Sequence, residues 1–160
     1  MSGPLRGHAP DSVPLRVADH PFFQGLDADL TREASRLAVE RRFETGELIV
    51  RDGDQATSFY LVFYGKIALE VETSEKPRLT IQTVGPGEVL GWSWLVPPYH
   101  WRLDARVLKP TQVLAIDAPA FRKAMAAHPD EGYQLLLRLL PIIAQRLENT
   151  QIQLLDIHGL

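Results

Sequence analysis

The sequence of 160 residues contains no cysteine. This absence excludes disulfide frameworks, thiolate catalysis, iron–sulfur clusters and cysteine-ligated zinc. No apolar run approaches the roughly 20 residues that a helix needs to span a bilayer. The first residues, Met1 to His8, also lack the apolar stretch of a secretory signal. The sequence therefore predicts a cytoplasmic protein with no membrane segment.

Clustered positive charge is missing as well. The chain carries 17 lysines and arginines against 20 aspartates and glutamates, which gives a formal net charge of −3. A surface that binds duplex DNA needs grouped positive charge to displace counterions from the phosphates. No basic cluster is longer than that in Glu40-Arg41-Arg42, so we expect no specific binding of DNA.

Recognisable catalytic constellations are absent too. A metal-dependent barrel enzyme of the cupin class needs two or three histidines and a carboxylate that converge from neighbouring strands. The chain has five histidines, of which only His100 lies near a predicted strand, and no His-x-His pair. The phosphate loop of nucleoside triphosphatases is also missing. We therefore predict no enzyme, no catalytic residues and no metal site, and keep a cupin-like enzyme as the most distant alternative.

The length and a hydrophobic content of 45 % predict one folded domain. Residues 1–19 contain three prolines and two glycines and are predicted to form a flexible leader. The domain would span residues 20–160 and begin with a helical part at 20–38. There, Asp27 or Asp29 can cap a short helix whose apolar face carries Leu30, Ala34, Leu37 and Ala38.

The hydrophobic period changes to two at about residue 39, which indicates β-strands. The strand-like segments are 39–43, 47–51, 58–64, 66–72, 79–84, 101–108 and 112–116. Many short strands separated by turns predict an α+β fold built on an antiparallel, eight-stranded jelly-roll β-barrel over residues 39–117. A pair of helices at 118–160 would follow, a short one to Ala127 and a long one after Asp130.

The long helix carries apolar residues at steps of three and four. The members of this stripe are Tyr133, Leu136, Leu140, Ile143, Leu147 and Leu154. Such a heptad pattern predicts a seam between two helices, most simply between two copies of the chain. We therefore expect a homodimer, with the alternative that the same stripe packs against the barrel of its own chain.

Several motifs in the strand region resemble one known family. They are Phe43 to Asp54 (FETGELIVRDGD), Phe59-Tyr60-Leu61-Val62, Gly65-Lys66-Ile67 and Val84 to Gly91 (VGPGEVLG). Over roughly residues 20–156 the chain is similar to the cyclic-nucleotide-binding domain of catabolite activator-like regulators. The resemblance implies a non-catalytic regulatory or sensor domain whose ligand is cyclic AMP, cyclic GMP or a related small anion. The helix-turn-helix of those regulators would follow the long helix, where this sequence ends.

The resemblance also implies a ligand-binding cassette. Its candidate residues are Gly91, Trp92, Ser93, Trp94, Trp101, Arg102 and Leu103. In the family, a glutamate directly after the cassette glycine binds the ribose 2′-hydroxyl, and an arginine further on pairs with the phosphate. Here the residue after Gly91 is Trp92. We therefore expect weakened or altered nucleotide specificity.

The position of the phosphate arginine has two interpretations. Counting forward from Gly91 places Arg102 there, whereas counting back from Ala115-Ile116-Asp117 places Trp101 there. Alternation along the predicted strand turns Trp101 inward and Arg102 toward solvent. We expect Trp92 or Trp101 to occupy part of the vacated pocket, while an irregular start of the strand would still turn Arg102 inward.

The segment 92–101 contains all three tryptophans of the chain. These rings could form a wall for a planar ligand, fill the pocket themselves, or dock another protein. The alternative function is therefore a ligand-free interaction module that uses this segment. Thr150 and Gln151 follow Arg146-Leu147 at a spacing similar to that of the family's adenine-contacting residues, and otherwise form a solvated polar turn.

Overall fold

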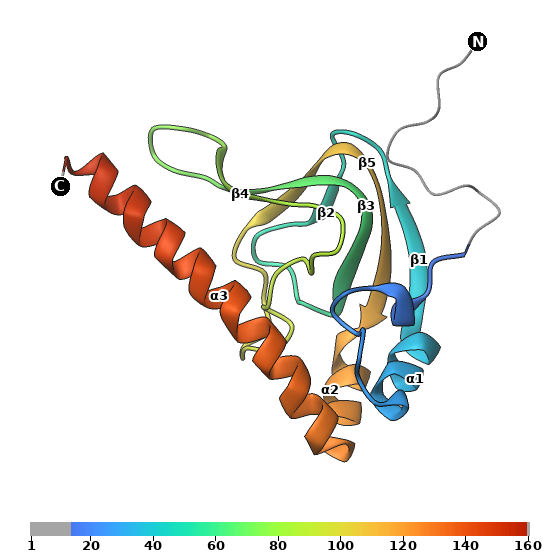
Figure 1. Ribbon diagram of the computed structural model, residues 1–160. Coiled ribbons are helices and arrows are strands. Elements are labelled where there is room, and N and C mark those ends of the chain that lie inside the picture. Colours follow the sequence, from blue (N-terminus) through green and yellow to red (C-terminus); the bar gives the residue numbers. More distant parts are fainter. Residues whose placement is uncertain (1–13, 160) are drawn as a thin grey trace, which may run out of the picture.

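The computed structural model describes residues 14–159 (Figure 1). A 3-10 turn, η1, precedes three helices and five strands. These elements are η1 (Val17–Asp19), α1 (Ala28–Leu37), β1 (Ala38–Phe43), β2 (Leu48–Val50), β3 (Ser58–Val71), β4 (Leu79–Val84), β5 (Asp104–Asp117), α2 (Ala118–Ala127) and α3 (Pro129–Ile157). Most of the predicted leader lies outside the described residues. Its last part forms η1, in which Val17 is buried.

All the paired strands are antiparallel, as predicted. The sheet has the order β1-β5-β3-β4, and β2 pairs with β5. Within the described residues the sheet has five strands rather than the eight expected, and the path has two free ends instead of closing into a barrel. The predicted three helices are confirmed, with α2 at the expected residues and α3 beginning at Pro129, two residues before the expected start.

The seven strand-like segments become five strands because two predicted turns are not turns, and the eighth expected strand has no counterpart among the described residues. Segments 58–64 and 66–72 join into β3, and segments 101–108 and 112–116 join into β5. At the junction Gly65 has a φ of 105°, and a Cβ there would collide with Thr111. The pairing of β3 with β5 shifts register around Gly65 and continues beyond it. A bulge of this kind bends a strand without ending it.

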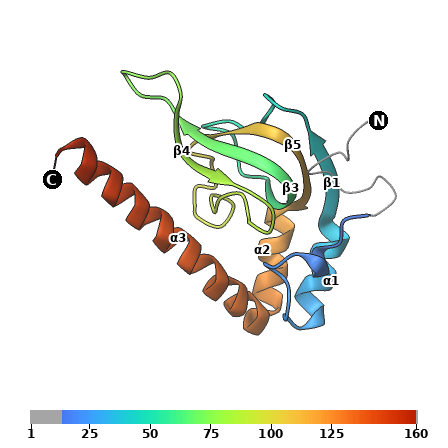
Figure 2. The same cartoon turned by 45° about the horizontal axis from the view of Figure 1, so that its top comes forward.

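The core lies between the sheet and the helices at one end of it. Phe59 of β3 and Phe121 of α2 pack with their ring centroids 5.2 Å apart. Leu30 and Ala34 of α1 are buried, as the predicted apolar face requires. The two views show α3 running from α2 along the side of the sheet that carries the segment between β4 and β5, with its last turns pointing away from the sheet (Figures 1 and 2).

The first turn of α1 is capped by a residue distant in sequence. Asp27 occupies the N-cap position, as predicted, but makes no side-chain cap hydrogen bond, and Asp29 lies inside the helix and pairs with Arg32. Instead, the backbone N–H of Leu30 donates to Oε2 of Glu131, 2.7 Å away in α3. A carboxylate at this position satisfies a free N–H group of the helix end and complements its dipole. Glu131 thus fixes α1 against α3.

Candidate ligand-binding site

The segment between β4 and β5 lies under α3 and contains the predicted cassette. Gly91 has a φ of 71°, in the left-handed region that favours glycine. A Cβ on Gly91 would lie 2.5 Å from Cζ3 of Trp101. Trp101 itself is only 2 % exposed. The indole of Trp101 therefore lies against the cassette glycine, in the space that this glycine opens.

The backbone on either side holds Trp101 in this position. Its N–H donates to the carbonyl of Asp54 at 2.8 Å, and its carbonyl accepts from the N–H of Gly53 at 2.8 Å. The next residue, Arg102, is exposed, and Leu103 is half-buried. Both precede β5, which begins at Asp104. The structure thus places Trp101 in the interior and Arg102 on the outside.

Trp94 belongs to the core. Its side chain is fully buried and stacks on Phe59 at 4.0 Å between ring centroids, with 15° between the planes. Arg122 of α2 donates from Nη1 to the Trp94 carbonyl at 2.6 Å and lies over the ring of Tyr99, 3.8 Å from its centroid. These contacts fasten the segment 92–101 to α2. Ser93, the remaining cassette candidate, is half-buried.

Trp92 lies beside a buried cation that the sequence did not reveal. Arg146 of α3 is 7 % exposed, and its guanidinium carbon lies 5.0 Å from the centroid of the Trp92 ring. Within the described part of the chain, Nε and Nη1 of Arg146 are buried without a hydrogen-bond partner. Burial lowers the pKa of Arg146 from its ordinary value, and the carboxylate of Glu88 opposes this shift. The available sequence signal is the position of Arg146 in a helical stripe with Leu135, Leu139 and Ile142.

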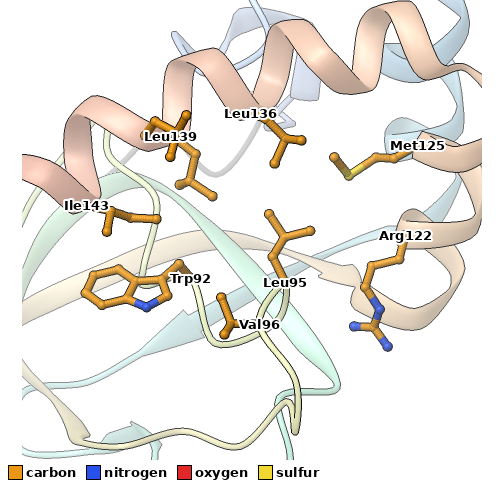
Figure 3. Close-up of a pocket in the computed structure, with 9 residues that line it drawn as sticks. Trp92, Leu95, Val96, Arg122, Met125, Leu136, Leu139 and Ile143 are labelled. Atoms are coloured by element: carbon orange, nitrogen blue, oxygen red, sulfur yellow. The ribbon is translucent and has the colours of Figure 1, made fainter.

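Two hollows flank Trp92. The larger measures about 400 Å³ and lies between α2, α3 and the cassette segment, with Trp92, Leu95 and Val96 facing Leu136, Leu139 and Ile143 (Figure 3). The smaller, about 250 Å³, is called the Arg146 groove here. It is lined by Leu69, Ile81, Gln82, Trp92, Leu103, Ile143, Arg146, Leu147, Asn149 and Thr150. Trp92 and Ile143 line both hollows.

The other candidates on α3 divide between this groove and solvent. The hydroxyl of Thr150 donates to the carbonyl of Arg146 at 2.9 Å, and Gln151 is exposed. Of the predicted seam, Ile143 is half-buried, and the remaining members are exposed in the single chain. These are Tyr133, Leu136, Leu140, Leu147 and Leu154.

The described residues contain one group with a spacing suited to a metal ion. Ligand atoms of Asp29, His128 and Glu131 lie within 4.8 Å of one another. One oxygen of Glu131 already accepts the N–H of Leu30, so Glu131 also has a structural role. No helix of residues 14–159 is both long enough and apolar enough to cross a membrane.

Comparison with known proteins agrees with this architecture. A cyclic AMP receptor protein of Thermus thermophilus is 29 % identical over 127 residues, which are 79 % of this chain and 53 % of that protein. The catabolite activator protein of Thermus thermophilus superposes with a TM-score of 0.67 at 25 % identity, covering 87 % of this chain and 63 % of the other. A cyclic nucleotide-binding domain of Methylobacillus flagellatus has a TM-score of 0.72 at 18 % identity, covering 88 % and 79 %.

The chain spans about half the length of its curated relative. Residues 40–128, more than half of the chain, match the sequence model of the cyclic nucleotide-binding domain. This match includes most of β1, all of β2 to β5, the cassette and α2. The predicted resemblance is thus confirmed, and the chain belongs to the cyclic nucleotide-binding domain family.

Proposed function

We propose that this chain is a non-catalytic regulatory or sensor domain that binds ordinary cyclic nucleotides weakly or not at all. The observation that supports this proposal is the placement of Trp101 against Gly91. The resemblance implies that the ligand binds in the cassette, and here the indole of Trp101 lies against the cassette glycine. Arg102, the candidate phosphate cation, is exposed, and Trp92 stands where the resemblance implies the ribose glutamate.

Loss of these two contacts would cost a large part of the binding free energy. A hydrogen bond to a charged group is worth about 1.5–3 kcal/mol. Since about 1.4 kcal/mol corresponds to a tenfold change in affinity, loss of both charged contacts would move a micromolar site toward the millimolar range. The burial of Trp101 adds a steric cost, because the ring must leave before a phosphate can enter.

Titration calorimetry with cyclic AMP and cyclic GMP tests this function. We expect dissociation constants weaker than about 100 μM for both. A dissociation constant of about 10 μM or tighter that Arg102→Ala abolishes would contradict the proposal. That result would mean that Trp101 moves away and Arg102 turns inward in solution.

A ligand-free interaction module is the second candidate. The exposed stretch Val96, Pro97 and Pro98 favours it, because these residues project from the cassette segment. The burial of Trp94 and Trp101 disfavours it, since aromatic rings in the core are unavailable to a partner. Changes in NMR chemical shift that are confined to residues 96–98 when a partner is added would support this second function.

We further propose that the protein is a homodimer through α3. Tyr133 is 59 % exposed and Leu147 is 58 % exposed in the single chain, and they belong to one heptad stripe. A contiguous apolar stripe on a helix face is typical of an interface. We expect a dimeric mass by light scattering, and a monomeric mass for Leu154→Glu, because a charge would enter the seam.

The matched control is Gln153→Glu, which adds the same charge beside the seam and should leave the dimer intact. A monomeric mass for the unmodified protein would refute the dimer. Equal dissociation by both variants would refute the seam, because it would show an effect of charge alone.

A further inference from the structure

The guanidinium of Arg146 is the one buried charge of the site for which the described residues provide no hydrogen-bonding anion. It is 93 % removed from solvent, and two of its three nitrogens have no partner. A buried charge without a partner is costly, and native structures keep one where a ligand or a second group completes it. Its surroundings therefore indicate what would complete it.

Contacts with Trp92 leave the donors of Arg146 available. The guanidinium carbon lies 5.0 Å from the ring centroid, which is a cation–π contact. The N–H groups of a guanidinium lie in its own plane and form a fork that matches a carboxylate. Glu88 is near enough to oppose the pKa shift of Arg146. The described ion pairs, however, include none within 4.0 Å between these two side chains.

The walls of the Arg146 groove are mostly apolar. Leu69 of β3, Ile81 of β4, Leu103 and Ile143 contribute aliphatic surface, and Trp92 contributes an indole. Gln82, Asn149 and Thr150 are the polar lining residues besides Arg146. The hydroxyl hydrogen of Thr150 is already donated to the backbone. A ligand with many hydroxyl groups would leave some of them unpaired here, whereas a hydrocarbon body would not.

We propose that the Arg146 groove binds a compact organic carboxylate with an apolar body, and that the carboxylate pairs with the guanidinium of Arg146. The inference deepens the proposed sensor function and rests on it. It assigns the anion to α3 rather than to Arg102. A groove of about 250 Å³ accommodates a ligand near the lower end of the usual range for small-molecule sites.

The test uses 2-naphthoate and its neutral analogue 2-naphthalenemethanol as probes, titrated calorimetrically into the full chain. We expect naphthoate to bind at least about tenfold more tightly than the alcohol, because only the carboxylate can pair with Arg146. Arg146→Gln should remove this preference. Arg32→Gln, the same substitution at an exposed position on α1, should keep it.

A folding defect can be distinguished from a lost ligand contact by thermal unfolding of Arg146→Met without ligand. Removal of an uncompensated buried charge should leave the unfolding temperature unchanged or raise it. Addition of naphthoate should then raise the unfolding temperature of the unmodified protein only. Lower stability of Arg146→Met would assign Arg146 a purely structural role and overturn the proposal.

The remaining outcomes are equally decisive. Equal affinity for naphthoate and the alcohol, retained preference in Arg146→Gln, or no naphthoate binding up to about 1 mM would overturn the carboxylate site. If these results occur while cyclic nucleotides bind weakly, the proposed function stands and only the ligand class fails. Tight binding of cyclic AMP that depends on Arg102 would overturn the proposed function, whatever naphthoate does.

Discussion

The contact between Gly91 and Trp101 can be tested by adding one methyl group. Gly91→Ala changes two things at once: it places a side chain at a φ of 71°, and it brings a Cβ to 2.5 Å from Cζ3 of Trp101. Left-handed backbone costs roughly 1–2 kcal/mol for a residue with a Cβ. Overpacking by a methyl group in a packed interior costs typically about 1–3 kcal/mol. The expected loss is therefore about 2–5 kcal/mol of unfolding free energy.

Gly46→Ala is the matched control. Gly46 has a φ of 93°, and a Cβ there would meet nothing within 4 Å. The unfolding free energy of this variant should fall only by the roughly 1–2 kcal/mol that a Cβ costs in left-handed backbone. Urea unfolding followed by circular dichroism, at one fixed protein concentration, measures both variants. The excess loss in Gly91→Ala over Gly46→Ala reports the contact with the indole.

The background of Trp101→Leu completes the test as a double-mutant cycle. With a smaller side chain at position 101, Gly91→Ala should cost about as much as Gly46→Ala. If Gly91→Ala costs no more than Gly46→Ala in the unmodified chain, Trp101 does not lie against the cassette glycine in solution. The argument for weak nucleotide binding would then lose its main support.

Two other buried groups give predictions about stability. Nε2 of His20 lies 3.0 Å from the carbonyl of Val62, and burial lowers the pKa of His20 below its ordinary 6.5. The unfolded chain therefore binds a proton at this histidine more readily than the folded chain does. The unfolding free energy should fall as the pH drops below about 6.5. Differential scanning calorimetry should show this loss in the unmodified protein and in His158→Gln, and a smaller one in His20→Gln. Glu131→Ala should lower the unfolding free energy by about 1.5–3 kcal/mol through loss of the charged hydrogen bond to Leu30, and Glu131→Gln should lower it less, as urea unfolding would measure. Equal losses of unfolding free energy in Glu131→Ala and Glu131→Gln would show that this carboxylate is not the cap.

The fold was largely predictable from local patterns. Period-two segments located β1 and β4 within a residue, and helical periodicity located α2 and α3. Gly65 and the gap at residues 109–111 misled the prediction, because glycine usually marks a turn. In the folded chain β3 and β5 pair on both sides of these residues, and the positive φ of Gly65 absorbs the register shift. Long-range strand pairing decides whether such a residue ends a strand, and this pairing cannot be deduced from the local sequence.

The cap of α1 illustrates the same limit. Asp27 occupies the N-cap position and has a suitable side chain, so local sequence favours it. The N–H of Leu30 donates instead to Glu131, which lies 101 residues beyond Leu30 in the chain. A buried acceptor brought in by α3 thus replaces the local one. Only the packing of α3 against α1 makes this contact available.

Helix α3 carries two stripes at helical spacing, and the one that is buried in the single chain is not the one that the sequence emphasised, so Arg146 was missed. Tyr133, Leu136, Leu140 and Leu147 form the stripe that the sequence emphasised, and they are exposed in the single chain. A second stripe contains Leu135, Leu139, Ile142 and Arg146, at steps of four, three and four residues, and is turned toward the rest of its own chain. Periodicity detects both stripes but cannot decide which of them faces the chain itself.

The charge of Arg146 made the second stripe harder to recognise from the sequence. An arginine on a helix is normally counted as solvent-exposed, so the sequence pattern ends this stripe before residue 146. The sequence pattern does not reveal that Arg146 lies beside Trp92. The indole gives the guanidinium a surface to pack on when the guanidinium is buried. Where the family resemblance implies a glutamate, this chain has an aromatic ring, and the ring cannot neutralise Arg146. Under the proposed function, Trp92 in place of the implied glutamate accounts both for the weak ribose contact and for a buried cation that has no hydrogen-bonding anion among the described residues.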